Sequence, residues 1–306
     1  MRNWYKNALK IAGGFLIAAS ATLVMGARSQ AVKVVHHPPE ARRPLALTPA
    51  GCGLAFEEVT ATTADGLRLV GWYLPSQNEA AILAAHGFRG DRADLLPAAE
   101  ILHRHGYGVL IGSFRAHDRS DGELITMGKT HLSDFETWYG YLLTRGDVDP
   151  GRIGLLGQSL GGALAIHYAA QNQSIKALAL DSVMDQFDDA LAAGIRHYTG
   201  LPGVPLAPLV RFWAERETGV DTAQIVPTVW IRSISPRPVL IMHGGADDRI
   251  PVNSGQNLYQ AAGEPKELWY EPAATHLAFH QESFRAEFER RLVGFFDRYL
   301  PDRADD

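Results

Sequence analysis

Cysteine is almost absent from this sequence, and acidic residues are absent from its first thirty positions. Cys52 is the single cysteine in 306 residues. No intrachain disulfide can therefore form, and a chain of this length needs none to bury a large core. Cys52 also lies too far beyond the apolar N-terminal run to be a lipidation site. Internal repeats and low-complexity tracts are absent too, so we expect one domain with appendages.

Basic residues are scarce outside the N-terminus. Four of the 29 lysines and arginines lie before Ala31, which leaves 25 basic against 34 acidic residues, a net charge of about −9, in the remainder. A surface of that sign is a poor match for phosphate backbones or anionic lipid. The balance excludes a nucleic-acid partner, and it limits any membrane contact to the N-terminal segment.

The N-terminus has the layout of an export signal. Arg2, Lys6 and Lys10 precede 17 uncharged residues, Ile11–Ala27, a length at the lower end of the roughly 17–25 needed to span a bilayer. An A-x-A-like cleavage site ends at Ala31. Residues 1–31 are therefore either a removed signal peptide or a retained membrane anchor, and a buried core helix is disfavoured. We expect the protein to act outside the cytoplasm.

Residues 32–53 are punctuated by proline and follow neither a helical nor a strand period, which predicts a tether. The pair His36-His37 within it could bind a metal weakly, but such pairs are usually solvated, and no metal site is expected. Residues 301–306 are a short tail.

Residues 54–300 are expected to form one α/β domain. The runs 56–63 and 67–74 predict a hairpin turning at 64–66. After it, apolar runs alternate with helical stretches, which favours a mostly parallel sheet with helices on both faces. The expected strands are 80–85, 108–111, 153–156, 177–180, 239–242 and 267–270, and the expected helices are 92–105, 130–145, 160–172, 253–262 and 281–299.

Residues 183–235 interrupt this alternation, because the segment is too long for an ordinary connection. It predicts a small helical cap over a pocket, and the alternative is a long crossover with one helix packed on the core. The large apolar side chains of the segment could line an acyl pocket or pack on the sheet, and both options stay open; they are Tyr198, Leu201, Phe212, Trp213 and Trp230.

The motif Gly157-Gln158-Ser159-Leu160-Gly161 stands between a predicted strand and a predicted helix. Glycines on both sides of a serine permit a sharp turn that exposes its hydroxyl above the sheet. A serine hydroxyl needs a base, and the base needs an acceptor that fixes its tautomer. Ser159 is therefore the predicted nucleophile.

His276, in the loop after the last predicted strand, is the candidate base, and His280 is its rival. Three carboxylates follow predicted strand ends and could orient it: Asp181, Asp247 and Asp248. An oxyanion hole needs two N–H donors. The backbone N–H groups of Phe88, in the loop 86–90, and of Leu160 are the predicted pair, with His86 bracing the loop.

Together these motifs resemble the α/β-hydrolase superfamily, and more narrowly its exported or membrane-tethered esterase and serine-aminopeptidase-like branch. The match spans residues 55–300 through H-G-F-x-G at 86–90, G-x-S-x-G at 157–161, H-G-x-x-D-x-x-I-P at 243–251 and T-H at 275–276. The resemblance implies the chain order Ser, Asp, His, with Asp247 as the acid. One departure is visible: residues 113–120 replace an acid and a glycine of the usual D-x-R-G-H-G-x-S with Ser113 and Asp118.

The resemblance implies a serine hydrolase that cleaves small carboxylic esters through an acyl-enzyme, without metal or organic cofactor. The same triad cleaves amides, so a peptidase or amidase is the first alternative. An acyltransferase and a non-catalytic binding protein on the same fold are the others.

Overall fold

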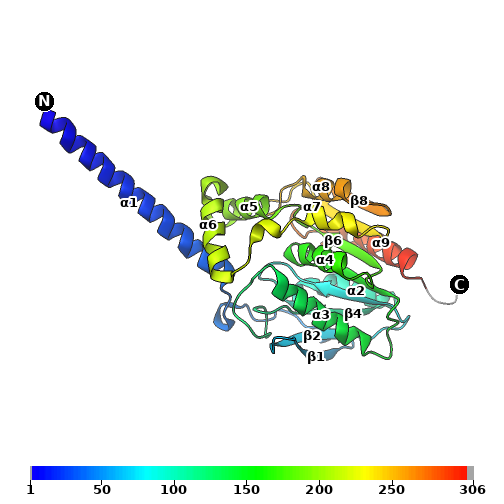
Figure 1. Ribbon diagram of the computed structural model, residues 1–306. Helices are drawn as coiled ribbons and strands as arrows, with labels where there is room; N and C mark the ends of the chain where they lie inside the picture. The colour runs from blue at the N-terminus through cyan, green and yellow to red at the C-terminus, as the bar shows by residue number, and fades with distance from the viewer. Residues whose placement is uncertain (1, 302–306) are drawn as a thin grey trace.

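The computed structural model describes residues 2–301 and contains an eight-stranded sheet between layers of helices (Figure 1). The strands are β1 (Glu57–Thr62), β2 (Arg68–Leu74), β3 (Ala81–Ala85), β4 (Gly108–Gly112), β5 (Ile153–Gln158), β6 (Ala177–Asp181), β7 (Val239–Gly244) and β8 (Lys266–Glu271). Their order is β1-β2-β4-β3-β5-β6-β7-β8. β2 is antiparallel to both its neighbours, and every other pairing is parallel. The predicted hairpin and parallel sheet are confirmed, with strand ends shifted by one or two residues.

Successive side chains along the central strands point to opposite faces of the sheet, so the core has one part on each face. Along β3, Leu83 and Ala85 belong to one apolar cluster and Ile82 and Ala84 to the other, as the period of two in a strand requires. The first cluster is covered by α3 (Lys129–Leu143), α4 (Leu160–Gln171) and α8 (Ser254–Ala261). The second is covered by α2 (Leu96–Arg104) and α9 (Glu282–Tyr299).

The predicted cap is present in the first part of residues 183–235. The helices α5 (Phe187–Thr199) and α6 (Gly203–Thr218) pack together beyond the sheet (Figure 1). The second part is a crossover, because α7 (Pro227–Trp230) returns to α4, where the Trp230 ring stacks on His167 with centroids 3.8 Å apart. The segment thus combines the two alternatives.

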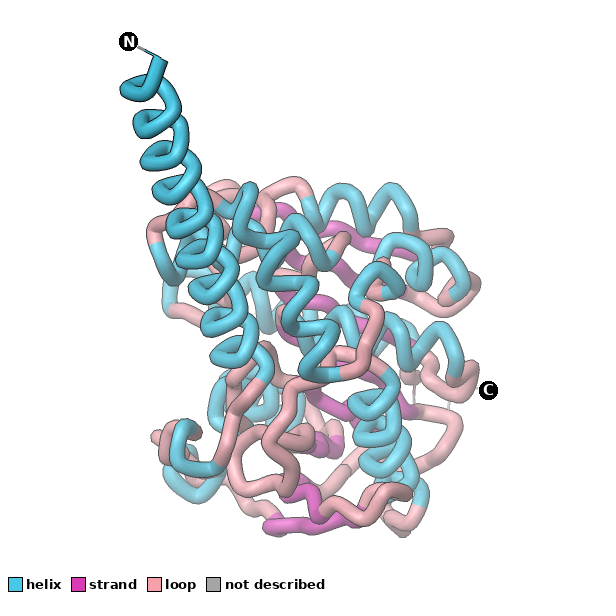
Figure 2. The backbone as a smooth tube through the Cα atoms, turned by 60° about the vertical axis from the view of Figure 1, so that its left-hand side comes forward, coloured by secondary structure: helices cyan, strands magenta, loops and turns pink. Residues whose placement is uncertain are grey.

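The N-terminal segment forms one long helix, α1 (Arg2–Val35), which projects away from the body (Figures 1 and 2). Its last turns pack on α6, and Ala27, Ala31 and Val35 are at most 2% exposed there. The helix continues through the predicted cleavage site. Within residues 2–301, no helix combines the length and hydropathy that a membrane span requires. Export stays a prediction.

Residues 36–53, which we call the strap, are bonded to the catalytic domain, in contrast to the loose tether expected from the sequence. The Arg42 guanidinium donates to the carbonyls of Asp118, Ser120 and Gly122. His37 bonds the Ala116 carbonyl at 2.7 Å. Of the predicted tail, residues 302–306 lie outside the described residues.

Candidate active site

Ser159 occupies the turn between β5 and α4 with φ of 51° and ψ of −120°, a strained conformation for a residue with a side chain. The turn is possible because its neighbours are glycines. A Cβ on Gly161 would lie 2.3 Å from the His86 carbonyl oxygen, and one on Gly157 would lie 2.4 Å from the Cα of Gly162. The predicted strand, turn and helix around Ser159 are therefore present.

The loop after β3 comes close to Ser159. A Cβ on Gly87 would lie 3.2 Å from the Ser159 Cβ, so the backbone of Phe88 follows directly beside the serine. Among the hydrogen bonds of residues 2–301, none uses the N–H of Phe88 or of Leu160. Leu160 is the first residue of α4, where N–H groups lack intrahelical acceptors and the helix dipole favours negative charge. Two donors are thus open beside Ser159.

Two buried histidines brace this loop. The Phe114 N–H donates to His86 Nε2 at 3.3 Å, and the Arg89 N–H donates to His117 Nε2 at 3.3 Å. Each ring must then be protonated at Nδ1, which contacts a carbonyl, that of Gly87 for His86 and that of Arg115 for His117. Burial lowers the pKa of both rings, so both stay neutral and keep these tautomers.

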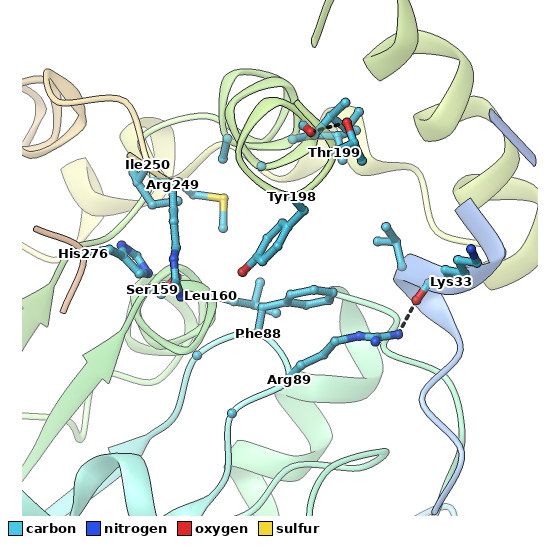
Figure 3. Close-up of a pocket in the computed structure, with 18 of the residues that line it drawn as sticks. Lys33, Phe88, Arg89, Ser159, Leu160, Tyr198, Thr199, Arg249, Ile250 and His276 are labelled. Atoms are coloured by element: carbon cyan, nitrogen blue, oxygen red, sulfur yellow. Dashed lines mark hydrogen bonds between the residues drawn. The ribbon is translucent and has the colours of Figure 1, made fainter. Parts of the chain in front are cut away.

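Asp247 and His276 form a hydrogen-bonded pair, and His276 lies next to Ser159 (Figure 3). His276 Nδ1 lies 2.8 Å from Asp247 Oδ2. The other oxygen, Oδ1, accepts the N–H groups of Arg249 and Ile250, both at 2.9 Å. Burial alone would raise the pKa of Asp247, but the bond to His276 and these two N–H groups outweigh it, so the pKa lies below its usual value. The carboxylate is therefore ionised and fixed against the imidazole.

The rival carboxylates have other partners. Asp181 is buried beneath the turn, where its Oδ1 accepts the Ser182 hydroxyl at 2.9 Å and burial raises its pKa to about 6. Asp248 is exposed and lies 3.0 Å from Nδ1 of His197 on the cap. The rival base His280 lines the cavity described below, but its buried Nδ1 has no hydrogen-bond partner among residues 2–301.

Ser159, Phe88, Leu160 and His276 line a cavity of about 1060 Å³ between the sheet and the cap. The Ser159 hydroxyl itself makes no hydrogen bond with any residue of the described chain, and such catalytic contacts are often long until substrate binds. Among the apolar cap residues singled out above, Tyr198 and Leu201 line the cavity. Phe212, Trp213 and Trp230 do not line it.

Residues 124–303 match the model of the prolyl oligopeptidase family. The chain belongs to the prolyl oligopeptidase family. It is 30% identical to the uncharacterized protein Rv2307c of Mycobacterium tuberculosis over 88% of each chain. It is also 30% identical to the uncharacterized protein YfhR of Escherichia coli K12, over 78% of this chain and 80% of that protein. Among solved structures it is similar to the esterase Pf2001 of Pyrococcus furiosus, with a TM-score of 0.73 and 27% identity over 87% of this chain and 98% of that one.

The predicted α/β-hydrolase fold is thus confirmed, and this prolyl oligopeptidase family member is a serine hydrolase. The departing loop 113–120 contacts the loop 86–90 through the bonds of Phe114 to His86 and of Arg89 to His117. Ala116 and Asp118 both have positive φ, 60° and 47°, a conformation that favours glycine. The Asp118 carboxylate accepts a hydrogen bond from Arg92 Nε at 2.5 Å, and both side chains are almost fully buried.

The sequence did not predict that α1 belongs to the site. In this prolyl oligopeptidase family member, the side of α1 that carries Leu23, Gly26, Ala27 and Val34 lines the cavity that holds Ser159. The spacing of Ala27, Ala31 and Val35 by four residues is the one signal that could have predicted a packed helix face there.

Proposed function

We propose that this enzyme hydrolyses carboxylic esters through an acyl-enzyme intermediate. Ser159 attacks the ester carbonyl while His276 takes its proton and then gives it to the leaving alcohol. Asp247 holds the imidazole, and the N–H groups of Phe88 and Leu160 stabilise the oxyanion. Water then releases the acid by the same route. The observation that carries the proposal is the 2.8 Å contact between Asp247 and His276 at a cavity that Ser159 also lines.

The composition of the cavity supports an ester over a peptide. A peptidase that binds a free amino terminus needs an unpaired carboxylate. Among the described residues that line the cavity, Asp94 is the one acid, and Arg43 binds it. The similarity to an esterase at 27% identity points the same way. The name of the family keeps a peptidase as the second candidate.

The test of the ester proposal is the variant Ser159→Ala with p-nitrophenyl acetate and butyrate as substrates. We expect turnover to fall to background, because the nucleophile is gone. Ser174→Ala is the matched control, since Ser174 is exposed and does not line the cavity. Unchanged turnover in Ser159→Ala would refute the assignment.

Three further measurements separate the alternatives. Aminoacyl-p-nitroanilides assayed beside the esters test the peptidase. A fluorophosphonate probe labels Ser159 in an enzyme and leaves a non-catalytic binding protein unlabelled. An alcohol acceptor added to the ester assay reveals acyl transfer as a new ester product.

Action outside the cytoplasm is also a proposal. It is supported by the order of Arg2, Lys6 and Lys10 before the uncharged run Ile11–Ala27. A C-terminal alkaline phosphatase fusion, which is active after export only, tests it, and an inactive fusion expressed at a normal level contradicts it.

A further inference from the structure

We infer that α1 is a wall of the substrate cavity and that the enzyme acts on esters of medium-chain or long-chain fatty acids. This inference rests on the proposed ester hydrolysis and adds the substrate class.

The docking of α1 on the cap is close and apolar. Ala27, Ala31 and Val35 lie on one side of the helix and pack with Ile195 of α5 and Val210 of α6 in a single buried cluster. Small side chains at a spacing of four let two helices approach closely. The last turns of α1 are therefore part of the cap.

Arg89 holds the end of α1 to the catalytic domain. Its Nη2 donates to the carbonyl of Lys33 (Figure 3) and, at 2.8 Å, to that of His36. The last carbonyls of a helix have no intrahelical donor, and a cation there is favoured by the helix dipole. Arg89 directly follows Phe88, so these bonds tie α1 to the loop beside the nucleophile. The helix is thereby fixed over the cavity.

The wall that α1 contributes has an apolar part beside the polar residues Thr22, Gln30 and Lys33, and this apolar part continues onto α5. Leu23 and Ala27 from α1 line the same cavity as Leu191 and Ile195 from α5. The volume of about 1060 Å³ lies just above the range of roughly 300–1,000 Å³ for pockets that bury drug-sized ligands. An acetyl group would leave most of it empty, whereas an alkyl chain would fill it from Ser159 toward α1.

The N-terminal segment contributes to the cavity, so its removal would change the cavity. Cleavage after Ala31 would remove Leu23, Gly26 and Ala27 from the cavity and take Ala27 and Ala31 out of the buried cluster that contains Ile195 and Val210. The inference therefore requires that the active enzyme keeps α1.

The test narrows the cavity from the α1 side. A Cβ on Gly26 meets no atom within 4 Å, so the fold accepts a larger side chain there, and Gly26 lines the cavity. The variant is Gly26→Phe. Gly194→Phe makes the same change from α5, where Gly194 is equally open and also lines the cavity. The matched control is Gly14→Phe, at an exposed and open position of the same helix outside the cavity.

The measurement is kcat/KM for p-nitrophenyl acetate and p-nitrophenyl decanoate. In the unmodified enzyme kcat/KM should rise with chain length, by at most about fourfold for each buried methylene. Gly26→Phe and Gly194→Phe should each lower the ratio of decanoate to acetate by about tenfold or more, the contact of roughly two methylenes. Gly14→Phe should keep the ratio. An unchanged ratio in both cavity variants, or a preference of the unmodified enzyme for acetate, overturns the inference.

A binding measurement separates this inference from the proposed chemistry. Dansyl-undecanoic acid, titrated by fluorescence into Ser159→Ala, needs no turnover, and Gly26→Phe in that background should weaken its binding by about tenfold. If no ester is hydrolysed and this weakening is observed, ester hydrolysis fails and the apolar cavity wall stands. If esters are hydrolysed and Gly26→Phe leaves binding unchanged, the inference that α1 contacts the acyl chain is refuted and ester hydrolysis is supported.

Discussion

Replacing Asp181 by asparagine should make the protein more stable at neutral pH and leave its stability near pH 4 almost unchanged. Asp181 ends β6 and is 1% exposed. Its backbone carbonyl accepts the N–H of Ser159, and its side chain accepts the hydroxyl of Ser182. Burial is the largest influence on the carboxyl and raises its pKa; nearby Asp247 raises it further, and the bond from Ser182 and the proximity of His276 lower it only in part.

The size and sign of the effect follow from the difference between the folded and unfolded states. The pKa of Asp181 rises from 3.8 to about 6 on folding. Between these values the folded state binds more protons than the unfolded state, so stability falls as the pH rises through this window. A shift of about two units corresponds to about 3 kcal/mol, fully lost above pH 6. Asparagine has no charge to bury, and its side chain can still accept the Ser182 hydroxyl.

Urea unfolding of both proteins at several pH values between about 4 and 8, at constant ionic strength, measures the effect. The free energy of unfolding of Asp181→Asn minus that of the unmodified protein should be near zero at pH 4 and rise toward about 3 kcal/mol above pH 6. Asp189→Asn, at an exposed position of α5, should give a flat difference. A flat difference for Asp181→Asn as well would refute the reasoning.

Two other variants test the site and the loop behind it. Asp247→Asn should lower kcat for p-nitrophenyl butyrate on the order of 10⁴-fold, because an amide favours the wrong tautomer of His276; a loss below tenfold would assign the orienting role elsewhere. Arg92→Met should lower the free energy of unfolding in urea by about 3–5 kcal/mol, because it leaves the Asp118 carboxylate buried without its partner. Adding Asp118→Gly should restore most of that loss, and a double variant as unstable as the single one would contradict this explanation.

The parts of this fold that the sequence predicts are those set by local pattern. The strand period, the apolar runs and the glycines around Ser159 depend on neighbours in the chain, and the structure has each element within a few residues of its expected place. The pairing of Asp247 with His276 was expected on different grounds, since only the motif pattern distinguished it from Asp181 and Asp248. In the structure it is visible as one hydrogen bond between loops 29 residues apart.

The placement of residues 27–53 could not be predicted in the same way, because contacts with distant parts of the chain fix it. An uncharged run behind three cations indicates export whatever it packs against, and nothing local shows that Ala27, Ala31 and Val35 meet α6. Likewise, the prolines of residues 36–53 predict a tether, and nothing local shows which distant carbonyls its donors bond. Arg42 finds three of them, at positions about 80 residues away in the sequence.

The departing loop and the strap of this enzyme are bonded to each other. The loop carries Ala116 and Asp118 with positive φ, a conformation that costs roughly 1–2 kcal/mol for each such residue. Its carbonyls face the strap, which supplies the Nδ1 of His37 to Ala116 and the guanidinium of Arg42 to Asp118. The strap follows α1 directly, and His117, within the same loop, accepts the N–H of Arg89. Contacts therefore run without a gap from the end of α1 through the strap and the loop 113–120 to Arg89, next to Phe88, so the end of α1 and the loop 86–90 are held as one unit.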